Sequence, residues 1–302
     1  MKKALVIDSN NLLYRIFYMN RARGTDVNML HVFLNCIKSY VNVVGGVDTI
    51  IAVWDSRLCR GQPNFRRVAA DTDYKGNRDR EGLEEAHVLD EQIQLAIESL
   101  GGFNMFPYRM EADDVIAWLT HTQTDYEFTI VTVDKDMYQL VKENVCIYSP
   151  IKKIMVNKTN FPQVAGINQE HFLTYKALIG DKSDNIPGIP KVGDKTARKI
   201  IDKGIKQTLT EEHYKIYEKN IELMDLSHGY NVHDGEVSCY QEQIKQLANC
   251  KRDKASLKKI CIHNAVYQIA NNIDNWFTLF ESGGNNVPNV VNLIKSLNIN
   301  SK

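Results

Sequence analysis

The sequence predicts an α/β fold, with a mostly parallel, twisted sheet flanked by helices and a smaller helical domain after it. Short apolar runs alternate with amphipathic helical patterns through the first half of the chain, which is typical of a parallel sheet covered by helices. Three of the apolar runs end at an aspartate, namely Asp8, Asp55 and Asp134. Ligands of such sheets bind beyond the carboxyl ends of the strands, so this edge is the expected site.

Each element of the first half has its own pattern. We expect strands at residues 3–7, 49–54, 103–108, 128–133 and 145–149, all of them short apolar runs. Apolar residues recur at helical spacing in four stretches, which predicts helices at residues 11–17, 30–44, 89–100 and from 111 onward. Glycine pairs at 45–46 and 101–102 end two of these helices. Residues 1–167 are therefore expected to form the α/β domain.

The second half, residues 168–302, has helical patterns without strand patterns. One late helix is predicted over residues 214–224 from the spacing of its apolar side chains. From residue 282 the chain is rich in Asn and Gly, which predicts a flexible tail. A short helix at 290–294, acting as a partner-binding peptide, is the alternative for that tail.

Composition excludes several classes of protein. No apolar run approaches the length of a membrane span, and the apolar stretch before Asp8 is too short for a signal peptide, so a cytoplasmic location is expected. The six cysteines form no CxxC pair, which favours reduced thiols. A zinc site built from Cys250, Cys261 and His263 is the alternative. The net charge is zero, from 37 basic and 37 acidic residues.

Acidic residues gather where the sheet should end. Nine carboxylates occupy the predicted edge or adjoining segments: Asp8, Asp55, Glu111, Asp113, Asp114, Asp134, Asp136, Asp181 and Asp184. Oxygen ligands alone favour Mg²⁺ or Mn²⁺, and so many acids suit two ions about 4 Å apart. Helix capping and helix-dipole complementation are the alternatives. With these nine acids on metal, the remaining formal charge is about +9, which suits a polyanionic partner.

Two basic stretches are candidate nucleic-acid contacts. Residues 57–80 carry seven Arg or Lys side chains, Arg66 and Arg67 among them, interleaved with Phe65 and Tyr74. Cations with aromatic rings suit a single strand, whereas a solvated loop is the alternative.

The second stretch, residues 186–203, reads as a tight hairpin between two helices. Helix-start amides near residue 194 would bind phosphates without reading sequence. A plain turn between helices is the alternative. Candidate contacts are Gly188, Lys191, Gly193, Lys195, Thr196, Arg198 and Lys199.

Together these motifs resemble the 5′-nuclease superfamily, which includes flap endonucleases and the 5′→3′ exonuclease domain of bacterial DNA polymerase I. The chain is most similar to stand-alone bacteriophage 5′→3′ exonucleases, including the phage ribonuclease H. The resemblance covers roughly residues 3–203, and the nine acids match the metal ligands of that family. It implies a PIN-like or resolvase-like nuclease core with an arch or clamp at residues 57–85. It also implies a helix–hairpin–helix element at residues 186–203.

The resemblance implies Mg²⁺-dependent two-metal hydrolysis near a free 5′ end or a single-strand/duplex junction, with Mn²⁺ able to substitute. Such activity serves primer removal and DNA replication or repair. Tyr74, Lys75 and Arg78 match the base of the arch and would steer the scissile phosphate. The hairpin would bind duplex DNA and a K⁺ ion.

The expected partner is DNA with a 5′ flap or free 5′ end, and the protein is expected to be a monomer, in the host cytoplasm if a phage encodes it. An RNA–DNA hybrid substrate and a single-strand-binding protein or clamp as partner stay open.

Four other functions are weighed against this interpretation. A PIN-type ribonuclease shares acids on a similar sheet, but the basic insertion and the glycine hairpin disfavour it. A non-catalytic junction-binding protein would need gaps among the acids, and the chain has none. A phosphatase with a covalent aspartate would need a second aspartate at position 10, where the chain has Asn10. A zinc peptidase is disfavoured because none of the eight histidines falls among the acids.

Overall fold

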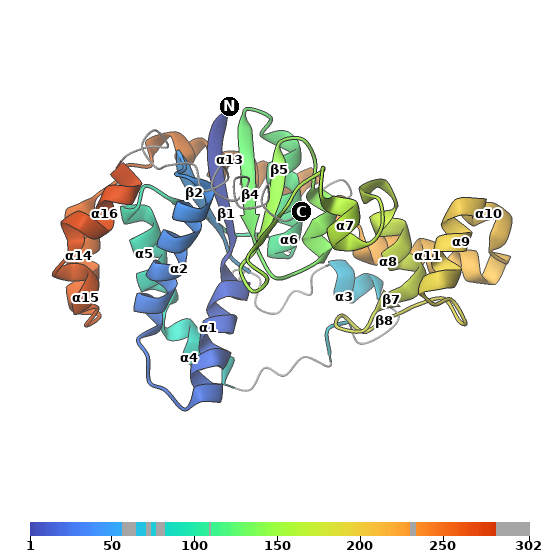
Figure 1. Ribbon diagram of the computed structural model, residues 1–302, viewed down its shortest axis with the longest axis horizontal. Coiled ribbons are helices and arrows are strands. Elements are labelled where there is room, and N and C mark those ends of the chain that lie inside the picture. The colour runs from blue at the N-terminus through green and yellow to red at the C-terminus, as the bar shows by residue number, and fades with distance from the viewer. Residues whose placement is uncertain (56–64, 71–73, 77–81, 109, 230–233, 282–302) are drawn as a thin grey trace, which may run out of the picture.

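The structure is a computed structural model that describes residues 1–55, 65–70, 74–76, 82–108, 110–229 and 234–281 (Figure 1). The predicted tail from residue 282, with its alternative helix at 290–294, lies outside the described residues. So does much of the predicted arch segment, including Arg78.

A six-stranded sheet with the order β3-β2-β1-β4-β5-β6 forms the centre of the molecule. Its strands are β1 (Lys2–Asp8), β2 (Thr49–Val53), β3 (Phe103–Met105), β4 (Tyr126–Val131), β5 (Val145–Ser149) and β6 (Ile154–Val156). All neighbours pair in parallel except β5 and β6, which are antiparallel. The predicted fold class is confirmed. The edge strand β6 was not predicted, because its three residues, of which only Val156 is fully buried, are too few to show a pattern.

Alternating side chains of β1 feed two hydrophobic cores, one on each face of the sheet. Leu5 and Ile7 pack under α1 (Ser9–Arg23), α2 (Met29–Val44) and α5 (Asp90–Ser99). Ala4 and Val6 face α6 (Ala112–Thr122) and α13 (Asp234–Lys245). Because β1 is covered on both faces, its residues read as an unbroken apolar run that stops at Asp8.

The remaining helices are short or lie in the second half of the chain. They are α3 (Phe65–Ala69), α4 (Leu83–Ala86), η1 (His87–Leu89), η2 (Asp136–Leu140), α7 (Phe161–Ala165), η3 (Gln169–His171), α8 (Phe172–Ile179), α9 (Asp194–Lys203), α10 (Ile205–Thr208), α11 (Glu211–Met224), η4 (Gln246–Asn249), α14 (Lys254–His263), α15 (Tyr267–Ala270) and α16 (Ile273–Glu281). None of the described helices is long and apolar enough to cross a membrane.

A glycine-dependent hairpin connects α8 to α9. It contains a two-residue ladder of β7 (Gly180–Asp181) and β8 (Ile186–Pro187), so the prediction of no strands after residue 168 was wrong. A Cβ on Gly180 would lie 2.2 Å from the amide nitrogen of Gly188, and one on Gly188 would lie 2.3 Å from the carbonyl oxygen of Ile179. By contrast, Gly193 has an ordinary φ of −103° and no heavy atom within 4 Å of an added Cβ. The turn therefore requires glycine at 180 and 188, not at 193.

The last three helices pack on the α/β core. Leu257, Phe277 and Phe280 share one hydrophobic cluster with α2 and α5, and Trp276 donates its indole N–H to Asn35 Oδ1 at 3.1 Å. Figure 1 places α14, α15 and α16 beside α2 and α5, at the opposite end of the molecule from α9 and α10. This placement differs from the single helical domain expected over residues 168–302, because amphipathic spacing shows that a helix has a buried face but not what covers it.

The cysteines and histidine considered for a zinc site take no such arrangement. Cys261 is fully buried in the cluster formed with α2 and α5, and burial raises the pKa of its thiol to about 11. In the described part of the chain, no three His, Cys, Asp or Glu side chains come together as a ready-made metal cage.

Candidate active site

Three aspartates meet at the carboxyl edge of the sheet, because β2, β1 and β4 are parallel neighbours. Asp8 ends β1, Asp55 follows β2 and Asp134 follows β4. Asp8 is only 7% exposed, and its carboxylate accepts hydrogen bonds from the Asn11 amide at 3.3 Å and the Thr132 hydroxyl at 3.1 Å. The first of these bonds caps α1, so the chain turns at Asp8 while its carboxylate stays at the edge.

Asp55 connects this edge to the start of α6. Its amide N–H donates to Asn10 Oδ1 at 2.7 Å, and its Oδ1 accepts from the Ala112 amide at 3.2 Å. The acidic helix start at residues 111–114 is therefore held beside the strand ends. This arrangement brings the first five predicted metal ligands, from three segments of the chain, into one region.

The carboxylates at this edge repel one another. Burial, followed by the charges of Asp55 and Asp134, raises the pKa of Asp8 to about 7. Burial, followed by Asp134 and Asp8, raises the pKa of Asp113 well above its usual range. Burial, followed by the charge of Asp134, also raises the pKa of Asp136, to about 6.

These shifts indicate surplus negative charge that nearby cations such as Lys75 and Lys176 neutralise only in part. Such a set of hard oxygen donors fits Mg²⁺ or Mn²⁺. The described acids do not converge into a closed group of three or more as their side chains stand.

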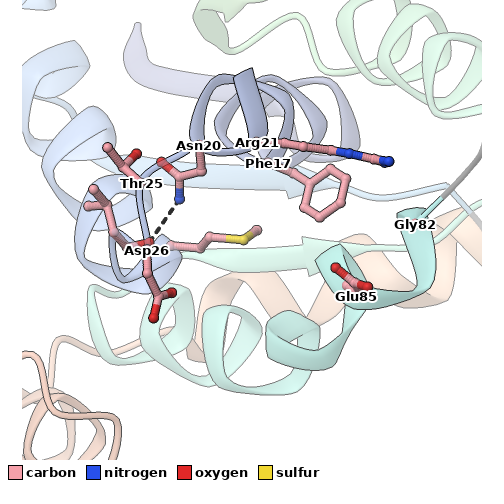
Figure 2. Close-up of a pocket in the computed structure, with 9 residues that line it drawn as sticks. Phe17, Asn20, Arg21, Thr25, Asp26, Gly82 and Glu85 are labelled. Carbon is pink, nitrogen blue, oxygen red and sulfur yellow. Dashed lines mark hydrogen bonds between the residues drawn. The ribbon is translucent and has the colours of Figure 1, made fainter. Parts of the chain in front are cut away.

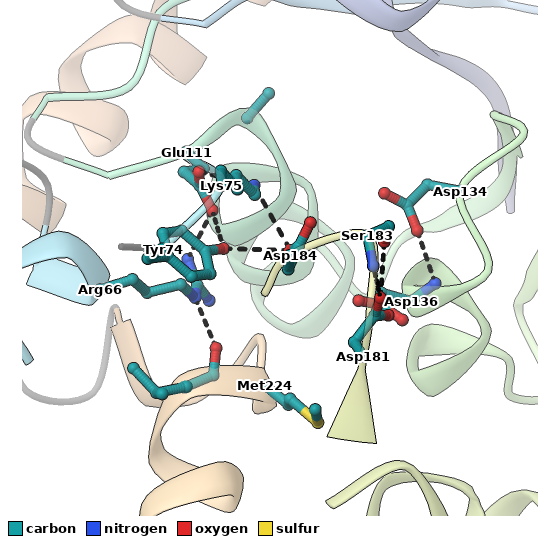
Figure 3. Close-up of polar contacts among 12 residues, drawn as sticks. Arg66, Tyr74, Lys75, Glu111, Asp134, Asp136, Asp181, Ser183, Asp184 and Met224 are labelled. Atoms are coloured by element: carbon teal, nitrogen blue, oxygen red, sulfur yellow. Dashed lines mark hydrogen bonds and ion pairs between the residues drawn. The ribbon is translucent and has the colours of Figure 1, made fainter. Parts of the chain in front are cut away.

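Glu111 is held by cations from the described part of the predicted arch segment (Figure 3). Its Oε1 accepts from Lys75 Nζ at 2.7 Å, and its Oε2 accepts from the Tyr74 hydroxyl at 3.0 Å. Burial alone would raise the pKa of Glu111, but Lys75 and then Arg66 outweigh it and hold that pKa at about 2. Glu111 is therefore ionised and already paired with a lysine ammonium.

Asp114 and Arg66 depart from their predicted roles. Asp114 is fully buried, and its two oxygens accept from the Arg66 guanidinium at 2.6 and 2.5 Å. Arg66 is 2% exposed, so it does not lie on a surface that DNA could reach, whereas Arg67 is exposed. The sequence could not distinguish these neighbours, because a run of basic residues reads as a surface feature.

The glycine hairpin reaches the same site through Asp184. The Tyr74 hydroxyl donates to Asp184 Oδ2 at 3.3 Å, and Lys75 Nζ lies 3.8 Å from that oxygen. The Lys75 amide also donates to the Asp184 carbonyl at 3.1 Å. Burial, followed by the charge of Glu111, raises the pKa of Tyr74, so its hydroxyl remains a hydrogen-bond donor.

Lys176 bridges the outer acids and was not predicted. Its ammonium contacts Asp136 Oδ1 at 2.7 Å and also donates to Asp181. Asp181 further accepts from the Ser183 amide and hydroxyl at 2.7 and 2.6 Å. Burial opposes ionisation of Asp181, but the hydrogen bonds from Lys176 and Ser183 hold its pKa below the usual range. A lysine in the last turn of a helix is too common to have signalled this role.

The exposed side of the hairpin carries a different set of side chains. Lys191, Lys195, Thr196 and Lys199 are exposed around the start of α9. Arg198 is instead engaged by the protein, because it donates to Asp194 Oδ1 at 3.0 Å and to the Gly166 carbonyl at 2.5 Å.

Two hollows on the described part of the surface lie away from the acids. One of about 630 Å³ lies between the end of α1 and Gly82, lined by Phe17, Arg21, Asp26 and Glu85 among others (Figure 2). Another of about 1280 Å³ runs along the outer side of α1 and α2.

The fold and the acids at its edge define a resolvase-like α/β domain joined to a helical unit. Residues 3–167 match the family model described as 5′-3′ exonuclease, N-terminal resolvase-like domain, and residues 167–230 match that described as 5′-3′ exonuclease, C-terminal SAM fold. The chain belongs to the 5′-3′ exonuclease family.

Curated relatives agree with this assignment. The 5′-3′ exonuclease of Aquifex aeolicus is 30% identical over 215 residues, which are 67% of this chain and 70% of that protein. The thermostable DNA polymerase I of Thermus thermophilus is 30% identical over 205 residues, which are 66% of this chain but 24% of the polymerase. The chain thus spans about a quarter of the polymerases that it matches.

Solved structures share the fold. The T5 D15 protein, co-crystallised with metal ions, covers 82% of this chain and 99% of its own length, with a TM-score of 0.64 and 21% identity. Flap endonuclease-1 from Methanococcus jannaschii covers 93% of each chain, with a TM-score of 0.55 and 12% identity. At 21% and 12% identity, the structural similarity establishes the shared fold alone.

Proposed function

We propose that this protein is a structure-selective 5′→3′ exonuclease and flap endonuclease that hydrolyses phosphodiester bonds near 5′ ends or single-strand/duplex junctions. The observation that carries the proposal is the group of mutually repelling carboxylates at the sheet edge, Asp8, Asp113 and Asp134 in particular. Membership of the 5′-3′ exonuclease family supports it. Primer removal during DNA replication or repair is the proposed role.

Two Mg²⁺ ions, with Mn²⁺ able to substitute, are the proposed cofactors. Asp8, Asp55, Glu111, Asp113 and Asp134 would hold the first, and Asp136, Asp181 and Asp184 would hold the second. When bound, the ions would neutralise phosphate charge and activate a water for attack at phosphorus. The T5 relative crystallised with metal ions is consistent with this cofactor.

Protein side chains would place the substrate against that edge. The Lys75 ammonium and the Tyr74 hydroxyl sit between Glu111 and Asp184, where they would bind the phosphate to be cleaved. Burial opposes the charge of Lys75, but Glu111 outweighs it and keeps the pKa of Lys75 above its usual range, so the ammonium stays charged. Arg78, outside the described residues, is proposed to assist.

The hairpin is the proposed duplex contact. Lys191, Lys195, Thr196 and Lys199 are exposed beside the first turn of α9, whose free amides favour a backbone phosphate. An added Cβ at Gly193 would meet no protein atom, so the helix start is open to a ligand. A K⁺ ion at this hairpin belongs to the same proposal, and Arg67 would contact the single strand.

The proposed substrate is DNA with a 5′ flap or free 5′ end, and RNA–DNA hybrids are a second substrate to test. A monomer in the cytoplasm, assisted by a single-strand-binding protein or clamp, completes the proposal. The solved structure of a T5 D15 flap endonuclease with DNA and metal ions supports DNA as the substrate class.

The test is a product-size assay on 5′-labelled flap, nicked and blunt duplexes, in Mg²⁺ and in EDTA. We expect short products from the flap and nicked substrates in Mg²⁺ only. Asp134→Asn should abolish them, whereas Asp125→Asn should not, because Asp125 is exposed at the other end of β4. Equal cleavage in EDTA, or full activity of Asp134→Asn, would refute the proposal. Preferential cleavage of a matched RNA flap would favour a PIN-type ribonuclease.

A further inference from the structure

Arg66 is an ionised side chain almost without solvent, at 2% exposure. Burying a guanidinium is costly unless each of its donors has a partner. Here its Nε donates to the Leu223 carbonyl at 2.8 Å, and both terminal nitrogens donate to Asp114. Its Nη1 also lies 3.3 Å from Glu111 Oε2. These partners come from α6, its N-cap and α11, so Arg66 joins α3 to two other parts of the fold.

The ion pair between Arg66 and Asp114 is closely packed by its neighbours. The guanidinium stacks 4.5 Å from the centre of the Phe65 ring. A Cβ on Gly229 would lie 2.8 Å from that ring and 3.1 Å from Asp114 Oδ1. Since Asp114 Oδ2 also accepts the Glu111 amide at 3.0 Å, the capping of α6 depends on the same carboxylate. Asp114 is fully buried, and both of its oxygens already accept hydrogen bonds from Arg66 or the Glu111 amide.

Arg66 and Lys75 both belong to the predicted arch segment, and their side chains meet at Glu111. Arg66 approaches Oε2 of Glu111, and Lys75 donates to Oε1 at 2.7 Å. The geometry points to Arg66 as a positioning residue: through Asp114 and Glu111 it fixes Lys75 beside the phosphate to be cleaved, and Asp114 serves this ion pair instead of an ion. This inference rests on the proposed nuclease function.

The first test is a double-mutant cycle in single-turnover cleavage of a 5′ flap at saturating Mg²⁺. Arg66→Lys keeps the positive charge but loses the bidentate hydrogen bonding to Asp114. The variant should cleave roughly 10²-fold more slowly, as expected when a catalytic group is misplaced. In the Lys75→Met background the same change should cost less than about threefold, because the effects of coupled residues are not additive. Arg15→Lys, which alters an arginine bonded to Tyr40, is the control for the substitution itself.

The second test counts bound Mn²⁺ by electron paramagnetic resonance without turnover, and it uses Asp114→Asn, which keeps the size and one acceptor oxygen. We expect Asp114→Asn to bind as many ions as the wild type, with affinity within about threefold, whereas Asp134→Asn binds fewer. This count remains decisive if Arg66→Lys does not fold. Multiplicative losses in the cycle, or an ion lost in Asp114→Asn, would overturn the inference. A wild-type protein that cuts no flap would instead refute the proposed function.

Discussion

Replacing Asp8 with Asn tests whether the edge acids destabilise the protein until cations bind. Burial and the charges of Asp55 and Asp134 raise the pKa of Asp8 from 3.8 to about 7. Between those pH values the folded protein keeps a proton that the unfolded chain has released, so the free energy of unfolding falls as the pH rises through this window. Above it, the difference corresponds to about 4 kcal/mol of lost stability.

Asp8→Asn removes that charge while keeping an oxygen that can accept from Asn11 and Thr132. In EDTA at pH 8 the variant should therefore be more stable than the wild type by up to about 4 kcal/mol, and its Tm should rise on the order of 5–10 °C. At pH values near 3.8 the two proteins should unfold alike. Mg²⁺ should stabilise the wild type strongly at pH 8 but the variant only weakly, because a ligand stabilises the state that binds it.

Thermal unfolding followed by circular dichroism, at pH 4 and pH 8 with Mg²⁺ or EDTA, measures all of these quantities. Asp125→Asn, at the opposite end of β4, is the control and should not change the response to Mg²⁺. The reasoning fails if Asp8→Asn lowers the Tm in EDTA at pH 8. It also fails if Mg²⁺ raises the Tm of the variant as much as that of the wild type.

Three further outcomes are expected. Asp55→Ala should abolish flap cleavage with unchanged circular dichroism, and full activity would contradict its role at the edge. Lys75→Ala should slow single-turnover cleavage roughly 10²-fold with a milder loss in DNA affinity, since Lys75 is proposed to bind the scissile phosphate; an unchanged rate would remove it from the mechanism. Gly188→Ala should weaken duplex binding in a filter assay, because its Cβ would lie 2.3 Å from the Ile179 carbonyl oxygen; wild-type affinity would show that this hairpin does not hold DNA.

The sequence predicted the sheet because its strands are buried on both faces and end at aspartates. The run before Asp8 was apolar for that reason, and the same held for the runs before Asp55 and Asp134. Parallel pairing then placed the three carboxylates at one edge without further information. The β6 strand escaped prediction because an edge strand of three residues carries too little pattern.

The sequence predicted the acids that lie close to one another at the site. It did not predict which acids are neutralised by a nearby arginine or lysine. Asp113 and Asp136 carry raised pKa values in the structure, as expected of acids without a cation nearby to neutralise them fully. Asp114, however, is neutralised by Arg66, and Asp181 is paired with Lys176. A sequence lists which residues are charged but not which of them are neighbours, so these two ion pairs required the fold.

The packing of the C-terminal helices has a practical consequence for trimming the protein. The matched family regions end at residue 230. The side chains of Leu257, Trp276 and Phe277, which follow, pack on and cover an apolar surface formed by α2 and α5. A shortened chain that stops where its relatives align would bare that surface to water and should tend to aggregate. Expression trials of a chain truncated at residue 230 would therefore underestimate the solubility of the 302-residue protein.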